Sequence, residues 1–227
     1  MFVGHYSVSY ALRTEENKIP LWVLFLAVQL IDIFWGIFVL LGLEKVRIIP
    51  GFTASNPLDL YYMPYTHSLI GVLCWSGLAF GAYGLLRKSG RGPALLVALA
   101  VFSHWILDLV VHRPDLALFD DTMKVGFGLW DYRLPAFVLE IGLLTGGVLL
   151  YLKRNAESPS VRKSGTIIFL AVMILIQAFN VFAGRPVSTD RAMAASAIFS
   201  YLALALVAFL LERKRKIAAQ SAAGVQG

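Results

Sequence analysis

Three ionisable residues recur at intervals of four in one apolar stretch of the chain. The segment SHWILDLVVHRPD, residues 103–115, places His104, Asp108 and His112 at positions i, i+4 and i+8. Four residues turn an α-helix by about 400°, so the three side chains share one face over two turns. Imidazole and carboxylate together suit zinc, manganese or iron, and the zincin motif also sets two histidines at i and i+4. The spacing therefore predicts a metal site, with polar contacts between helices as the alternative.

Four further residues could complete this site. His67 precedes an apolar run in YMPYTHSL, and His5 lies in GHYSVSYAL. Asp32 and Glu140 each stand alone inside apolar segments, AVQLIDIFWG and LPAFVLEIG. Ionisable groups inside such segments are costly and usually functional. We expect Asp32 and Glu140 to orient or deprotonate an attacking water, although each could instead be a buried partner of another polar group. The expected metal ligands are His5, His67, His104, Asp108 and His112.

Arg113 follows His112 directly and is a candidate for substrate binding. Its guanidinium could hold a phosphate or carboxylate with two hydrogen bonds. The alternative is an arginine that reaches toward lipid headgroups.

The segments that hold these residues are apolar enough to cross a membrane. Of the 227 residues, 58% are hydrophobic and 15% are charged, whereas about 25% are charged in soluble domains. This composition excludes a cytosolic globular enzyme, and the net charge of +6 is read as a topology signal and not as a nucleic-acid surface. We predict an all-α, polytopic membrane protein in which about six transmembrane helices form one bundle with a short N-terminal helix. The expected spans are 19–43, 67–86, 93–112, 134–152, 165–184 and 192–211.

The distribution of basic residues predicts an orientation. With six spans, 13 basic residues lie on the side of the two termini and seven on the other side. The positive-inside rule then puts both termini in the cytoplasm and the site toward the outer half of the inner membrane. His5 begins on the inner side in this arrangement. It can reach the site only if residues 2–13 form a re-entrant helix that the rest of the bundle covers.

The chain divides into parts of different polarity within a single domain, 1–227. Residues 1–152 hold the helices that carry the candidate site residues, whereas the spans within 165–211 contain no acidic, basic or histidine residue, and Gln177 and Asn180 are their most polar members. These two spans are expected to be scaffold or the contact of a homo-oligomer. Residues 212–227 are expected to be a flexible basic tail.

These motifs resemble one protein family. An N-terminal GH, a mid-helix Asp, the YTHS segment and SHWILDLVVHRPD are similar to the YdjM-like group of bacterial inner-membrane proteins, which are labelled membrane-bound metal-dependent hydrolases. The likeness covers about residues 1–150. A more distant likeness joins the chain to zinc-dependent phospholipase C and single-strand zinc nucleases, where it implies a metal-bridging role for Asp108. Those enzymes begin with a metal-binding Trp and end their ligand set with HxxxE, whereas this chain begins Met1-Phe2 and has Ala136 before Glu140. One or two zinc ions are therefore expected, not three.

The resemblance and the residues together imply a reaction class. We expect a membrane-embedded metal-dependent hydrolase that cleaves a lipid or lipid-linked phosphoester by metal-activated water. Its partners would be the bilayer and a lipid-like substrate, with no nucleic acid. Two alternatives stay open. His67 and His112 could ligate a haem in an electron carrier, or the intramembrane Asp, His and Glu side chains could serve a small ion-coupled transporter.

Overall fold

The computed structural model describes residues 1–227 apart from 89, 159–160, 184–188 and 225–227, and it describes no side chains in 213–224. Helices dominate the described chain. The 3-10 helices are η1 (Val3–His5) and η2 (Leu129–Asp131), and the two strands are β1 (Lys45–Ile48) and β2 (Leu58–Tyr62). The α-helices are α1 (Tyr6–Leu12), α2 (Leu21–Val28), α3 (Leu30–Leu40), α4 (Leu69–Arg87), α5 (Arg91–Val111), α6 (Arg133–Arg154), α7 (Lys163–Phe182) and α8 (Asp190–Gly224).

Five of these helices are long and apolar enough to cross a membrane. They are α4, α5, α6, α7 and the part of α8 that ends at Glu212, and α2 with α3 makes a sixth span if the bent pair counts as one. All six segments expected from the sequence are therefore helical. The architecture is that of an apolar helix bundle, and it is compatible with a multi-pass membrane protein. The helix α8 also continues to Gly224, through residues for which the sequence suggested a flexible tail.

The first expected span, 19–43, is broken in the middle. Helices α2 and α3 meet at Gln29 with a bend of 51°. Gln29 has φ −107° and ψ 6°, which is outside the helical region, so the regular backbone hydrogen bonding is interrupted there. Backbone groups freed at such a break need other partners in an apolar setting. One of these groups, the carbonyl of Val28, becomes part of the candidate site described below.

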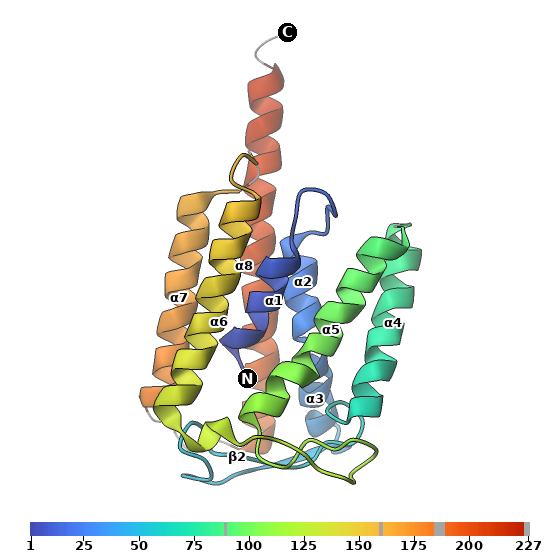
Figure 1. Ribbon diagram of the computed structural model, residues 1–227, viewed down its shortest axis with the longest axis vertical. Coiled ribbons are helices and arrows are strands. Elements are labelled where there is room, and N and C mark those ends of the chain that lie inside the picture. Colours follow the sequence, from blue (N-terminus) through green and yellow to red (C-terminus); the bar gives the residue numbers. More distant parts are fainter. Residues whose placement is uncertain (89, 159–160, 184–188, 225–227) are drawn as a thin grey trace.

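The amino-terminal segment lies inside the bundle. Figure 1 shows the N-terminus near the middle of the helices, with α1 running from there toward the end at which α2 begins. Val3, His5 and Tyr6 are all fully buried. Helix α1 packs closely on α6, because a Cβ atom on Gly147 would lie 2.5 Å from the carbonyl oxygen of Ser7. The amino-terminal segment is thus covered by the rest of the bundle, as the sequence required for His5 to reach the site.

A thin layer of strands and loops closes one end of the bundle. Strands β1 and β2 pair antiparallel, with Arg47 opposite Asp59 and a bulge between Lys45 and Arg47. The long connection between α5 and α6 joins this layer (Figure 1). The chain is mostly helical, as predicted, and the two short strands are an addition in residues 44–66, which the sequence indicated only as a connection. A small apolar core that includes Trp35, Leu60 and Leu116 fixes this layer to the helices.

Candidate metal centre

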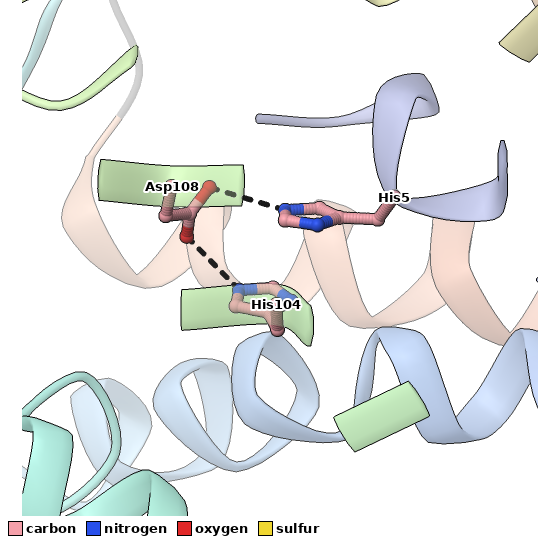
Figure 2. Close-up of side chains that lie close together, drawn as sticks. All are labelled: His5, His104 and Asp108. Atoms are coloured by element: carbon pink, nitrogen blue, oxygen red, sulfur yellow. Dashed lines mark hydrogen bonds and ion pairs between the residues drawn. The ribbon is translucent and has the colours of Figure 1, made fainter. Parts of the chain in front are cut away.

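Four histidines and two aspartates from four segments of the chain converge inside the bundle. Asp108 on α5 lies in the middle of the group. Its Oδ1 is 3.1 Å from Nε2 of His5, and its Oδ2 is 3.1 Å from Nε2 of His104 (Figure 2). The same Oδ2 is 3.5 Å from Nε2 of His112 and 3.8 Å from Nε2 of His67. The helical spacing thus brings His104, Asp108 and His112 together, although His112 follows the last residue of α5.

Asp32 supplies the second carboxylate of the cluster. Its Oδ1 lies 3.3 Å from Nε2 of His67 and 3.5 Å from Nε2 of His104. Two groups of residues could therefore hold a metal ion, namely His5, His104 and Asp108, and Asp32, His67 and His104. Within each group the ligand atoms lie within 4.8 Å of one another. The sequence analysis expected Asp32 to act on water, whereas the structure places it among the candidate metal ligands.

Three of the four histidines have their Nδ1 atoms held away from the centre. Nδ1 of His104 lies 2.7 Å from the carbonyl oxygen of Val28, and Nδ1 of His112 lies 2.7 Å from a carboxylate oxygen of Asp115. Since a carbonyl oxygen only accepts hydrogen bonds, Nδ1 of His104 carries the proton. In the neutral ring, Nε2 is then left with a lone pair that faces the two aspartates. Metal-binding histidines are oriented in this way in proteins.

His67 is oriented through a hydroxyl group. The Thr66 hydroxyl donates to Oε2 of Glu44 at 2.6 Å and lies 2.8 Å from Nδ1 of His67. Because the hydroxyl donates its proton in the hydrogen bond to Glu44, its oxygen accepts a hydrogen bond from Nδ1–H of His67. Glu44 is fully buried and also accepts the backbone N–H groups of Tyr65 and Thr66, each at 2.9 Å. Burial raises the pKa of the Glu44 carboxyl, and the hydrogen bonds from Thr66 and Tyr65 oppose this rise.

The donor set fits a bound cation. Lone pairs on Nε2 atoms and negative carboxylate oxygens repel one another at 3.1–3.5 Å unless a proton or a metal ion lies between them. Nε2 of His104 is buried and lies 3.1 Å from Oδ2 of Asp108, but it makes no well-oriented hydrogen bond with the described residues. The rings of His5 and His104 are stacked with centroids 3.9 Å apart, an arrangement that disfavours two imidazolium ions. A divalent ion satisfies these constraints with the ligand types that zinc prefers.

The number of ions is limited by His104. Both candidate groups use this residue, and the hydrogen bond to Val28 leaves it only Nε2 as a ligand atom. One His104 side chain can therefore serve one of the two groups at a time. A second ion would need His112 or Glu140 to complete its ligand set.

Glu140 holds the amino-terminal segment in place. Its Oε2 accepts the backbone N–H of Phe2 at 2.8 Å and of Gly4 at 3.2 Å. The amino group of Met1 contacts the carboxylate of Asp108. Gln29, at the break between α2 and α3, donates from Nε2 to the carbonyl of Phe2 at 3.2 Å. These contacts explain how His5 is delivered to the cluster, and they give Glu140 a positioning role beside any direct one.

Arg113 does not join the cluster. Its Nε donates to both carboxylate oxygens of Asp131 at 3.0 and 3.1 Å, and its guanidinium lies 4.9 Å from the ring centroid of Phe52. The side chain is 40% exposed and is not part of the cavity wall beside the histidines. The expected role in phosphate binding therefore has no support at this position.

A cavity of about 210 Å³ adjoins the cluster. Asp32, His67, Asp108, His112 and Glu140 form its ionisable wall. Residues of α7 and α8 form another part of the lining, whereas the sequence suggested that these helices were scaffold or the contact of a homo-oligomer. Glu44, Thr66 and Asp115 were not predicted from the sequence. The only signal for Thr66 was that it precedes His67, and Glu44 and Asp115 lie in loops that lead to or from a predicted ligand.

Comparisons with known proteins add no information on the site. No match to this chain was found among protein-family models, curated proteins or solved structures. The resemblance to the YdjM-like group therefore remains a prediction.

Proposed function

We propose that this protein is a membrane-embedded, metal-dependent hydrolase that cleaves an ester or phosphoester of a lipid-like substrate. One observation carries the proposal. The Nε2 atoms of His67, His104 and His112 point at the carboxylates of Asp32 and Asp108, while each Nδ1 is tied to an acceptor outside the cluster. This is an arrangement of ligands with orienting partners, and structural polar contacts do not require it.

The chemistry follows from the donor set. Three to five nitrogen and oxygen donors in one apolar bundle suit zinc, and manganese and iron are the alternatives. A divalent ion bound there would polarise the substrate oxygen and make water a competent nucleophile at neutral pH. Asp108 reaches histidines on both sides of it, so it is the residue best placed to be shared between two ions. This agrees with the bridging role that the distant resemblance implies.

The protein's own groups would bind and orient the substrate. The cavity is lined by the ionisable cluster and by apolar side chains that include Phe137, Ile176 and Val181. An ester bond could therefore lie at the cluster while an apolar chain packs along α6 and α7. Glu140 lines the same cavity and is close enough to the amino-terminal turn to fix its position. Glu140 is the candidate proton acceptor, because the other two carboxylates of the cavity wall are candidate metal ligands.

The test uses purified protein in phosphatidylcholine nanodiscs with chromogenic esters. Bis(p-nitrophenyl) phosphate, p-nitrophenyl phosphorylcholine and p-nitrophenyl butyrate report on three ester classes. We expect release of nitrophenol from at least one of them, loss of this activity in EDTA, and recovery with added Zn²⁺ or Mn²⁺. His104→Ala and Asp108→Asn should remove the activity, whereas Ser76→Ala, which alters a serine of α4 outside the cavity, should retain it. Activity that persists in EDTA and in both site variants would contradict the proposal.

An ion-coupled transporter is a second candidate, and one observation favours it. Broken helices beside ionisable residues mark ion sites in many transporters, and the break at Gln29 lies three residues before Asp32. The freed Val28 carbonyl accepts a hydrogen bond from Nδ1 of His104. A hydrolase with His104 as a metal ligand would use the same carbonyl to orient the ring. Metal or proton flux into proteoliposomes that is retained when Glu140→Gln has removed all hydrolysis would favour the transporter.

The haem alternative has less support. The carboxylate of Asp108 lies within 3.8 Å of the Nε2 atoms of both His67 and His112. The centroids of these two rings are 6.1 Å apart, and a carboxylate between them occupies the space that a macrocycle would need. A Soret band in the purified protein would overturn this reading.

A further inference from the structure

The wall that α7 and α8 contribute to the cavity is polar but uncharged. Gln177 and Asn180 of α7 line it, and so do Ser196 and Ser200 of α8. Among the described residues that line this cavity there is no lysine or arginine. The cavity therefore joins an ionisable, candidate metal-binding wall to a neutral hydrogen-bonding wall.

Gln177 has an unmet hydrogen bond. Its side chain is 4% exposed, and its Oε1 has no hydrogen-bond partner among the described residues. An unpaired buried amide oxygen is destabilising, so natural proteins seldom keep one without a reason. Because Gln177 also lines the cavity, a ligand bound in the cavity could supply the missing donor. The residues adjacent to it in sequence, Ile176 and Ala178, are apolar, whereas Asn180 follows one turn later on the same wall of the cavity.

The two serines present acceptors as well. The Ser196 hydroxyl donates to the carbonyl of Met193 at 2.8 Å, and the Ser200 hydroxyl donates to the carbonyl of Ser196 at 2.8 Å. Each hydroxyl donates its single proton to a carbonyl of its own helix. Its oxygen can therefore take part in a further hydrogen bond only as the acceptor. Gln177, Ser196 and Ser200 together thus offer three acceptor oxygens to one cavity.

This wall lies next to the candidate metal centre. Tyr201 follows Ser200 on α8 and lines the same cavity as Asp32. Its ring lies 5.8 Å from that of Phe2, close to the segment that carries His5. A group bound against the serines of α8 would therefore lie beside the substrate bond that the cluster is placed to attack.

We propose that Gln177, Ser196 and Ser200 bind an uncharged, hydroxyl-bearing headgroup of an amphiphile, such as a glycosyl or glyceryl group, next to the scissile ester. Acceptor oxygens call for a ligand rich in O–H donors, and the absence of lysine and arginine from the described lining argues against an anionic headgroup at this wall. Apolar neighbours such as Ile176 and Val181 suit the attached chain. This proposal rests on the proposed hydrolase in naming its substrate class, but the binding itself requires no metal.

Trp35 and Trp130 line the cavity and provide an optical reporter of binding. EDTA-treated wild-type protein in phosphatidylcholine nanodiscs is titrated with hexyl β-glucoside, and tryptophan fluorescence is recorded. Hexyl tetra-O-methyl-β-glucoside has the same chain and ring without O–H donors, hexyl phosphate carries an anionic headgroup, and free glucose lacks the chain. We expect saturable binding of hexyl β-glucoside and at least tenfold weaker binding of the other three probes.

Variants then assign the binding to the wall. Gln177→Leu and the double variant Ser196→Ala/Ser200→Ala should each weaken hexyl β-glucoside binding by roughly three- to tenfold, as expected for loss of one or two hydrogen bonds. Ser76→Ala is the matched control, because its hydroxyl donates in the same way to Val72, at 2.8 Å, on the distant helix α4. It should bind like the wild type.

The proposal would be overturned by equal binding of the methylated probe or of hexyl phosphate, or by unchanged affinity in both wall variants. Glucose that binds as tightly as hexyl β-glucoside would overturn the amphiphile as ligand. The probe comparison on wild-type protein requires no variant, so it is independent of any folding defect. Because metal is removed throughout, a failed hydrolase proposal would show in the nitrophenyl ester assay and not here.

Discussion

Nδ1 of His104 lies 2.7 Å from the carbonyl oxygen of Val28, a residue 76 positions earlier in the chain. This carbonyl is available because α2 ends at Val28 and the chain bends by 51° before α3. In an unbroken helix the same oxygen would accept the backbone N–H four residues later. The break therefore has a chemical use, since it fixes the ring of the histidine that both candidate metal groups share.

Removal of the Thr66 hydroxyl should weaken metal binding without removing a ligand. Thr66→Val keeps the side-chain shape but leaves Nδ1 of His67 without its acceptor and removes one of the three donors to Glu44. Loss of such an orienting partner typically costs 10- to 100-fold in metal affinity. Competition with a fluorescent zinc chelator measures this change. Thr122→Val, on an exposed turn, is the control, and equal affinity of the two variants would exclude an orienting role for Thr66.

A methyl group on Gly147 should displace the segment that carries His5. The added Cβ would lie 2.5 Å from the Ser7 carbonyl oxygen and 2.7 Å from its Cα, and neither backbone atom can yield without moving α1. We expect Gly147→Ala to lower the free energy of unfolding by about 1–3 kcal/mol. Gly146→Ala is the matched control, because its Cβ meets nothing within 4 Å and replacing a helical glycine by alanine is neutral or mildly favourable. Thermal unfolding in detergent that ranks the two variants equally would contradict the observed packing of α1 on α6.

Metal removal should destabilise the wild type and leave the site variants unaffected. An ion that binds the folded protein at 100 times its dissociation constant adds about 2.7 kcal/mol of stability. We expect EDTA to lower the midpoint of thermal unfolding of the wild type by several degrees, and added Zn²⁺ to restore it. The midpoint of Asp108→Asn should not respond to either reagent. A wild-type midpoint that is insensitive to EDTA and to Zn²⁺ would count against a structural contribution from the metal.

Loss of Arg113 should have little effect on the site. Its guanidinium is paired with Asp131 outside the cavity and is 40% exposed. Exposed ion pairs contribute at most about 1 kcal/mol. Arg113→Ala should therefore lower stability only slightly and leave both metal content and ester hydrolysis unchanged. A large loss of hydrolysis without loss of metal would restore the role in phosphate binding that the sequence suggested.

The sequence was informative where a local rule applies. The intervals of four between His104, Asp108 and His112 predicted one face of one helix, and hydropathy predicted all six helical segments. Both are properties of short stretches of chain. The prediction that residues 2–13 must re-enter the bundle for His5 to reach the site followed from topology, and the structure has this segment buried between α2, α5 and α6.

The remaining features depend on contacts between distant segments. Glu44 in a connecting loop had no recognisable pattern, and its link to His67 through Thr66 exists only because the loop folds back 22 residues later. Gln177 was noted only as a polar member of an apolar span and the serines of α8 were not singled out, since no sequence rule says which face of a helix borders a cavity. Arg113 was predicted from its position directly after His112, but helix α5 ends at Val111 and the structure pairs the guanidinium with Asp131 instead.

The most direct test of the metal centre is elemental analysis of the protein purified without added chelator. Inductively coupled plasma mass spectrometry of the wild type, His104→Ala and His112→Ala gives the number of ions per chain, with Cys74→Ser as a control for adventitious binding at an exposed thiol. The account predicts one or two divalent transition-metal ions per wild-type chain, the same content in Cys74→Ser, and a clear loss in both histidine variants. A wild-type protein that is correctly folded, that carries no stoichiometric transition metal and that takes up none on incubation with Zn²⁺, Mn²⁺ or Fe²⁺ would contradict it.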